Sequence, residues 1–224
     1  MRSVLLDTET TGLDPALGHR VIEIAAIELR NDLPSRQFFH RLLNPHRLVP
    51  PEATAIHGFS DADLAGKPDF ADVMPELLAF LGDGPIIAHN APFDFAFLDA
   101  EFSLCGAPAL ARERMIDTLA LAKSRFPGLP NNLDALCRRF SIDLAEHKSH
   151  NALLDCRLLA EVYVELTGGR QRGLALERRQ GRDIGEVPPG VLRRVPRRIV
   201  PSAEERRRHA GLLARLKAPL WQRG

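Results

Sequence analysis

The sequence has little of what membrane and secreted proteins require. All of its apolar stretches are far shorter than the ~20 residues that a membrane-spanning helix needs. No apolar secretory segment precedes the first predicted strand, which begins near residue 3. These absences predict a cytoplasmic protein that does not contact a membrane.

Cysteine is scarce as well. The chain of 224 residues has three cysteines, an odd number without a Cys-x-x-Cys spacing: Cys105, Cys137 and Cys156. All three fall in predicted helices, where a cysteine usually serves as a small buried hydrophobic side chain. A disulfide framework and a structural zinc site are therefore both disfavoured.

Charge is present in quantity but is unevenly distributed. Residues 1–168 contain 15 Lys and Arg against 24 Asp and Glu, a balance of −9, whereas residues 169–224 contain 15 against 5, a balance of +10. An acidic domain is not built to hold a bare polyanion over a broad basic surface. If this domain handles nucleic acid, we expect metal ions or a partner to neutralise the substrate. The basic tail could contact nucleic acid or an acidic protein surface.

Alternating apolar residues predict three strands near the N-terminus, at 3–7, 20–30 and 36–43. With the Asn31-Asp32 turn, they predict an antiparallel meander. Two short strands, at 85–90 and 115–117, are then interspersed with helices predicted at 70–81, 92–104, 118–125, 131–139 and 151–167. This order of elements indicates an α/β fold, with a mixed five-stranded sheet flanked by helices.

The composition changes after Gly168-Gly169, where the last of these helices is expected to stop. We therefore predict a first domain over residues 1–168. The following segment, 169–201, has four prolines, repeated arginine pairs and little periodicity. This texture is typical of a flexible linker.

Order is predicted to return in the terminal segment, residues 202–224. Ser202 and Glu205 form a capping-box pattern, which predicts a short basic helix over 204–217. Trp221 is the only tryptophan of the chain. It is interpreted either as an anchor for a partner or as a stray aromatic in a disordered tail.

Asp7 and Glu9 follow an apolar run near the start of the chain. Side chains two residues apart on a strand point to the same face, so the two carboxylates would lie side by side and repel each other. A hard divalent cation such as Mg²⁺, which prefers oxygen ligands, would relieve the repulsion. A solvated strand end carrying two surface acids is the alternative, and the pair alone does not decide between them.

Further candidate ligands occur in two other segments. Asp94 lies in the first turn of the helix predicted after strand 85–90, where an Asp is also a common partner of the helix dipole. Asp155 lies among leucines, where a lone carboxylate would be costly to bury. Five helical residues turn through roughly 500°, so His150 could share a site with Asp155 only from the loop before the helix.

Three of these segments resemble the motifs of the DEDD exonuclease superfamily, histidine subtype. They are Asp7–Gly12 (DTETTG), His89–Asp94 (HNAPFD) and His150–Asp155 (HNALLD). Further similarity runs through Val49–Ala53, Ile56–Gly58 and Asn132–Cys137. Over about residues 2–168 the chain resembles the epsilon, or proofreading, family of bacterial DNA polymerase III subunits.

This resemblance implies a ribonuclease H-like fold and two-metal hydrolysis of the 3′-terminal phosphodiester. Asp7, Glu9 and Asp155 would hold two divalent cations, Mg²⁺ or Mn²⁺, and would face the substrate, with Asp7 bridging the ions. Asp94 would assist the second ion, and His150 would be the general base.

Glu52 and His57 match positions that contact the terminal nucleotide in the family. A loop acid and a turn histidine are the alternative interpretations of these two residues.

The resemblance also suggests roles for the tail. Residues 171–176 (QRGLAL) are similar to peptides that bind sliding clamps, with Gln171, Leu174 and Leu176 as the contact residues. The segment departs from that pattern in two ways. It has Arg172-Gly173 after the glutamine, and Leu176 stands where an aromatic residue is common. Residues 202–224 would bind the polymerase III alpha subunit, and a small third core subunit is left open.

The function implied is a 3′–5′ exonuclease that removes mispaired nucleotides from single-stranded or frayed DNA 3′ ends during replication, in the nucleoid. One alternative is a stand-alone exonuclease acting on RNA or short oligonucleotides, which would not need the tail. Another is an inert protein that only bridges polymerase and clamp, and the intact set of five catalytic positions disfavours it.

Overall fold

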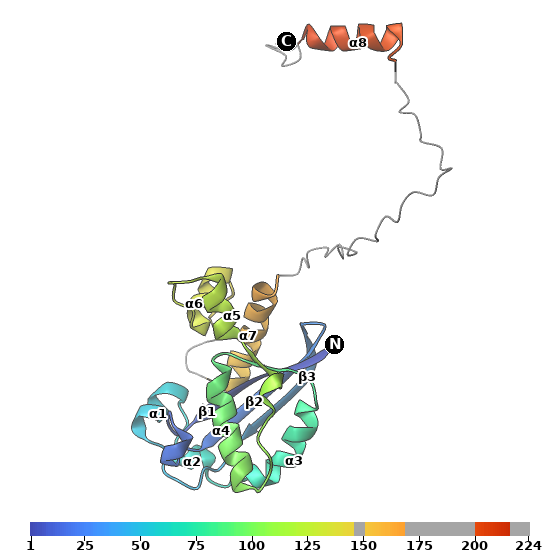
Figure 1. The fold of residues 1–224 in the computed structure, drawn as a ribbon. Coiled ribbons are helices and arrows are strands. Elements are labelled where there is room, and N and C mark those ends of the chain that lie inside the picture. Colours follow the sequence, from blue (N-terminus) through green and yellow to red (C-terminus); the bar gives the residue numbers. More distant parts are fainter. Residues whose placement is uncertain (146–150, 169–199, 216–224) are drawn as a thin grey trace, which may run out of the picture. The chain divides into compact units, whose positions relative to one another are not determined.

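A computed structural model describes residues 1–145, 151–168 and 200–215. The chain divides into two compact units, Met1–Leu174 and Ala175–Gly224. The described part of the first unit contains a five-stranded sheet and its flanking helices, and that of the second contains one helix (Figure 1).

The sheet has the strand order β3-β2-β1-β4-β5. Three strands form the antiparallel meander: β1 (Arg2–Thr10), β2 (Val21–Arg30) and β3 (Leu33–Leu42). On the other side of β1, β4 (Ile86–Ala88) pairs with β1 and β5 (Met115–Asp117) pairs with β4, both in parallel. The predicted meander and the mixed five-stranded sheet are therefore confirmed.

The turn between β2 and β3 has positive φ at both central residues, 54° at Asn31 and 64° at Asp32. Asn and Asp tolerate this conformation better than other residues with a side chain, and such turns suit the twist of a hairpin.

Two strand boundaries were predicted wrongly. β3 begins at Leu33, three residues before the predicted start at residue 36, because its pairing with β2 extends to the turn. The sequence placed the end of the first strand near Asp7, but β1 continues to Thr10 because its pairing with β2 extends that far. Asp7 and Glu9 therefore lie inside a paired strand and not at its frayed end. Their spacing is fixed by the sheet.

The helices of the first unit cover both faces of the sheet. All five predicted helices are confirmed to within two residues. Two further helices, α1 (Pro51–His57) and α2 (Asp61–Leu64), were not predicted, because seven and four residues are too few to show a helical spacing of apolar residues. The helices are α1 (Pro51–His57), α2 (Asp61–Leu64), α3 (Phe70–Leu81), α4 (Ala91–Leu104), α5 (Thr118–Arg125), α6 (Leu133–Phe140) and α7 (Ala152–Leu166). Two 3-10 turns occur at Pro15–Leu17 and Arg112–Arg114.

The core lies in two layers on either side of β1. Val4 and Leu6 pack with α3 and α4 on one face, and Leu5 packs with α5, α6 and α7 on the other. Figure 1 shows α4 and α7 on opposite sides of the strands. A strand that is buried on both faces is held firmly in place, and β1 carries Asp7 and Glu9 towards its C-terminal end.

The second unit is described over α8 (Ala203–Leu213). The capping box is confirmed, because the Ser202 hydroxyl accepts from the Glu205 N–H and the Glu205 carboxylate accepts from the Ser202 N–H. The helix ends at Leu213, four residues earlier than predicted, and none of its side chains is buried. Trp221 lies outside the described residues.

The structure also bears on the cysteines and on the question of membrane-spanning helices. The three cysteines are free, with Cys137 and Cys156 buried in helices and Cys105 at the C-terminal end of α4. Over the described ranges, no helix combines the length and the apolar character that crossing a bilayer requires.

A partly buried ion pair joins the residue before β2 to α4. Arg20 donates to both carboxylate oxygens of Glu101, at 2.8 and 2.7 Å, and the Val21 N–H donates to the same group at 3.1 Å. Glu101 is 2% exposed. The pair fixes the start of β2 against the helix that carries Asp94.

We expect Arg20→Met to lower the free energy of unfolding by about 3–5 kcal/mol, because it leaves the Glu101 carboxylate buried and without its cation. Arg41→Met is the matched control. It breaks an exposed pair with Glu76 and should cost about 0–1 kcal/mol. Urea unfolding of both variants measures the difference, and equal losses would contradict this account.

Candidate metal centre and active-site cleft

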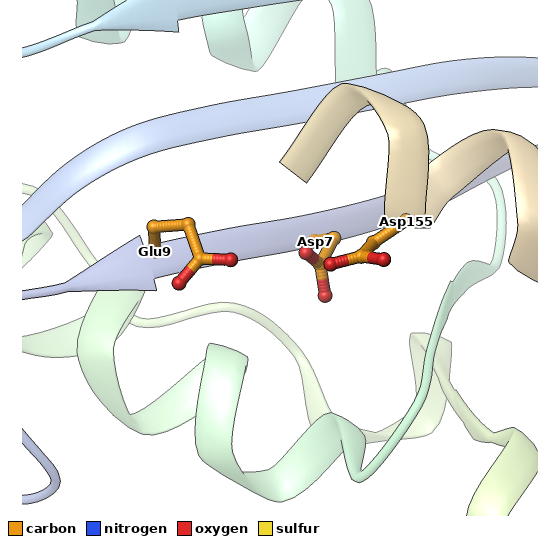
Figure 2. A group of neighbouring side chains, drawn as sticks. All are labelled: Asp7, Glu9 and Asp155. Carbon is orange, nitrogen blue, oxygen red and sulfur yellow. The ribbon is translucent and has the colours of Figure 1, made fainter. Parts of the chain in front are cut away.

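Three carboxylates from two elements meet beside β1. Asp7 and Glu9 project from the same face of β1, and Asp155 projects towards them from the first turn of α7 (Figure 2). One oxygen of each lies within 4.8 Å of the others. Asp155 is 4% exposed, so the group that the sequence placed among leucines does lie in the interior, next to two other acids.

Asp94 comes to the same region from α4. Its Oδ1 accepts from the Thr8 hydroxyl at 2.8 Å, and its side chain is 2% exposed. Thr8 stands between Asp7 and Glu9 in the sequence, and successive side chains of a strand point to opposite faces. Asp94 is thus held from the α4 side of β1. It is not one of the three carboxylates that lie within mutual ligand distance.

The carboxylates raise one another's pKa values. Burial, followed by the charges of Asp94, Asp155 and Glu9, raises the pKa of Asp7 well above its ordinary value. Burial, followed by Asp155 and Glu23, raises the pKa of Glu9 to about 8. Burial also raises the pKa of Asp94 to about 7, against the opposing effect of the Thr8 hydrogen bond.

Such a cluster of partly buried oxygen donors of like charge fits hard divalent cations. These cations bind carboxylates and compensate exactly this kind of repulsion. Burial and the neighbouring carboxylates are the main causes of the raised pKa values of Asp7 and Glu9. A bound divalent cation would compensate this charge.

A cleft of about 450 Å³ begins at Glu9 and extends along the residues that follow β1. Glu52 and His57, both on α1, line it together with Glu9. The predicted substrate contacts are thus brought to the carboxylate cluster by a helix that the sequence did not reveal. The remaining lining residues are Thr8, Thr10, Thr11, Gly12, Leu13, Asp14, Leu17, His19, Pro50, Ala53, Ile56 and Phe93.

His57 is almost enclosed, at 4% exposure. Its Nδ1 accepts from the Phe59 N–H at 3.1 Å, and its Nε2 is buried without a hydrogen-bond partner among the described residues. Burial lowers the pKa of His57, so the ring is neutral near pH 7. An unpaired buried nitrogen in a cleft wall suits a polar group of a ligand.

His150 lies outside the described residues, as do Gln171, Leu174 and Leu176. Their predicted roles therefore stay predictions. The helix that carries Asp155 begins at Ala152, after the Asn151 cap.

Two acids near the site were not recognised in the sequence. Glu23 is fully buried on β2 and is the register partner of Glu9. The sequence feature that could have revealed Glu23 is its charge within the otherwise largely apolar segment from Val21 to Leu29.

The second is Asp117, at the end of β5. Its Oδ1 accepts from the N–H groups of Leu119, Asn90 and Ala91, at 3.0, 3.0 and 3.3 Å. It thereby caps α5 and holds the start of α4.

Comparison with known proteins decides the family. The model of the exonuclease family matches residues 4–163. The chain is 50% identical over 174 residues, 76% of each chain, to DNA polymerase III subunit epsilon of Rickettsia felis. It is 41% identical to the same subunit of Rickettsia prowazekii over 93% of this chain and 94% of that one, and 41% identical to that of Escherichia coli over 83% and 80%. The chain belongs to the DNA polymerase III epsilon family.

Solved structures agree with this fold. Exonuclease X in complex with 5′ overhanging duplex DNA is 28% identical, with a TM-score of 0.59 over 73% of this chain and 90% of that one. The zinc-bound complex of Escherichia coli exonuclease I with single-stranded DNA has a TM-score of 0.63 at 19% identity, over 73% and 40% of the two chains. At 19% identity, the similarity to exonuclease I supports the fold alone. The predicted ribonuclease H-like α/β class is confirmed for this epsilon-family chain.

Removing one charge from the cluster should stabilise the metal-free protein. A carboxylate whose folded pKa is raised destabilises the fold by an amount that grows as the pH rises above its unfolded pKa of about 4 and is complete above its folded pKa. In a chelator at pH 8, Asp7→Asn should therefore raise the Tm, by roughly 2–4 °C for each kcal/mol of repulsion relieved. Thermal unfolding followed by circular dichroism measures the change.

The pKa values of about 8 for Glu9 and about 7 for Asp94 mark the upper end of the pH range over which this effect changes. The difference in Tm between variant and wild type should narrow steadily as the pH is lowered from 8 towards about 4, the ordinary pKa of carboxylates in the unfolded chain. Asp83→Asn, at an exposed position, is the control and should leave the Tm unchanged. A gap that widens towards low pH would contradict the assignment of the repulsion to these carboxylates.

Proposed function

We propose that this epsilon-family chain is the 3′–5′ exonuclease that removes mispaired 3′-terminal nucleotides during DNA replication, as part of polymerase III. The observation that carries the proposal is the cluster of Asp7, Glu9 and Asp155 at the end of a cleft lined by Glu52 and His57. Family membership supplies the reaction class. The site lies in the cytoplasm, at the nucleoid, in this proposal.

Asp7, Glu9 and Asp155 would hold two divalent cations, Mg²⁺ or Mn²⁺, and Asp94 would assist the second. Two such ions stabilise both the attacking and the leaving oxygen of an in-line displacement at phosphorus. The oxygen-only donor set and the raised pKa values of Asp7, Glu9 and Asp94 support this choice of metal.

The chain's own residues would position the substrate and move the proton. Glu52 and the neutral His57 would bind the terminal nucleotide, whose base would lie against apolar side chains such as Ile56 and Phe93. Apolar walls accept any base, so selectivity would come from fraying, since a mispaired end is unpaired at lower cost. Histidine suits proton transfer near neutral pH, and His150 would take the proton of the attacking water.

The tail would keep the acidic domain at its substrate. In this proposal residues 169–201 are a linker, 171–176 bind the sliding clamp, and 202–224 bind the polymerase III alpha subunit. The capping box of α8 supports the last role, because it specifies a helix whose own unit, as far as it is described, buries none of its side chains. A tether raises the effective concentration of one site at another.

Loss of a carboxylate should abolish hydrolysis without unfolding the protein. Asp155→Asn should reduce Mn²⁺-dependent digestion of single-stranded DNA by roughly a thousandfold, because several kcal/mol of transition-state stabilisation depend on the bound ions. Gel assays of a labelled oligonucleotide measure the rate, with Asp83→Asn as control. Undiminished digestion by the Asp155 variant would overturn the mechanism.

The tail should govern assembly and not chemistry. A chain ending at residue 201 should digest single-stranded DNA as the full chain does, yet no longer co-purify with the polymerase alpha subunit. Leu174→Ala with Leu176→Ala should weaken clamp capture alone. If polymerase capture survives the truncation, residues 202–224 are not the binding segment. If the full-length chain fails to capture the alpha subunit, the stand-alone exonuclease acting on RNA or oligonucleotides becomes the better assignment.

A further inference from the structure

Glu23 is a buried charge that the reaction described above does not use. It lies on β2, is 0% exposed, and is the register partner of Glu9 in the neighbouring strand. Partners directly opposite in an antiparallel pair point to the same face. Glu23 therefore faces α7, on the same side of the sheet as the carboxylate cluster. A fully buried carboxylate must be hydrogen-bonded or charge-paired to be tolerated.

Three donors satisfy this carboxylate. Oε1 is 2.6 Å from His40 Nε2 and accepts from Asn151 Nδ2 at 3.1 Å. Oε2 accepts from the Ala152 N–H at 3.0 Å. Asn151 is the N-cap of α7 and Ala152 is its first residue, whereas His40 belongs to β3. Glu23 thus ties the start of α7 to the sheet.

The tied residues lead directly to Asp155. The Asp155 N–H donates to the Asn151 carbonyl at 2.8 Å, which closes the first turn of α7. Asp155 must be held beside Asp7 and Glu9 although all three carry the same sign of charge. A restraint at the start of its helix opposes that repulsion whenever cations are absent.

We propose that Glu23 is a positioning residue that fixes the first turn of α7, and with it Asp155, at ligand distance from Asp7 and Glu9. This inference rests on the proposed function, in which those three carboxylates hold the catalytic cations. His40 completes the arrangement by fixing the Glu23 carboxylate from the edge strand. Glu23 acts through Asp155, because it is not one of the three carboxylates that lie within mutual ligand distance.

Glu23→Gln tests the proposal with little change of shape. Donors face both carboxylate oxygens, so an amide must place its own N–H₂ against one of them. In the full-length protein, kcat on single-stranded DNA should fall about tenfold or more and the Kd for Mn²⁺ should rise about tenfold, the usual effect of losing a group that orients a metal ligand. KM for the DNA should stay within about twofold, since Glu23 does not line the cleft.

Glu28→Gln is the matched control. Glu28 is a second buried carboxylate of β2, 4% exposed, and it is bonded to Arg2, Arg30 and Ser35 away from the cluster. Its variant should lose stability but keep the Mn²⁺ affinity and kcat of the wild type. Calorimetric Mn²⁺ titration and steady-state kinetics compare the two variants.

Asn151→Ser provides a milder second test. Serine retains the helix cap that the Asn151 side chain makes to the Leu154 N–H, but it lacks the amide that donates to Glu23. The Ala152 contact remains, so a smaller loss in the same direction is expected. If Glu23→Gln does not fold, this variant decides the question.

Two results would overturn the inference. One is a folded Glu23→Gln variant, or in its absence Asn151→Ser, with wild-type Mn²⁺ affinity and kcat. The other is an equal loss in Glu28→Gln, which would mean that any weakened β2 has this effect. A wild-type chain that neither binds Mn²⁺ nor digests DNA would instead refute the proposed function, so the two failures are distinguishable.

Discussion

Mutual repulsion among buried carboxylates is the constraint around which this molecule is organised. Asp7, Glu9 and Asp155 approach within ligand distance although burial and like charge raise the pKa values of Asp7 and Glu9. Such an arrangement needs a backbone that holds it in place, and a bound cation would compensate its charge. β1 supplies the backbone support, because it is covered on both faces by packed helices. The packed backbone holds the three carboxylates close together against their repulsion, and bound cations would relieve that repulsion.

The helices that approach β1 are held at their first turns. Glu23 binds the N-terminal residues of α7, and Asp117 accepts from the N–H groups that open α4. Helix N-termini have unpaired N–H groups and a positive dipole end, so carboxylates from the sheet are their natural partners. Each helix then delivers one acid, Asp155 or Asp94, to opposite sides of β1. Precise placement of ligands therefore depends on acids that need never touch the ions.

Periodicity and turn residues predicted most of the fold. The meander, the helices and the Asn31-Asp32 turn follow from local patterns that tertiary packing then retained. The short helix α1 and the extension of β1 to Thr10 did not follow, because seven residues carry too little periodicity and strand length depends on a partner strand. The three motif segments identified Asp7, Glu9, Asp94 and Asp155, since each motif keeps its acids at short, readable spacings.

By itself, the sequence determined most of the helices and strands, the family, and which acids belong to the cluster. The tertiary structure alone decided how close those acids come, which groups enclose the cleft and which acid supports another. Glu23 illustrates the difference. Its neighbours Asn151 and Ala152 are 128 and 129 residues away along the chain, and no local pattern can encode a contact between such distant residues. Only the packing of α7 on the sheet turns a lone charge in an apolar strand into a support for Asp155.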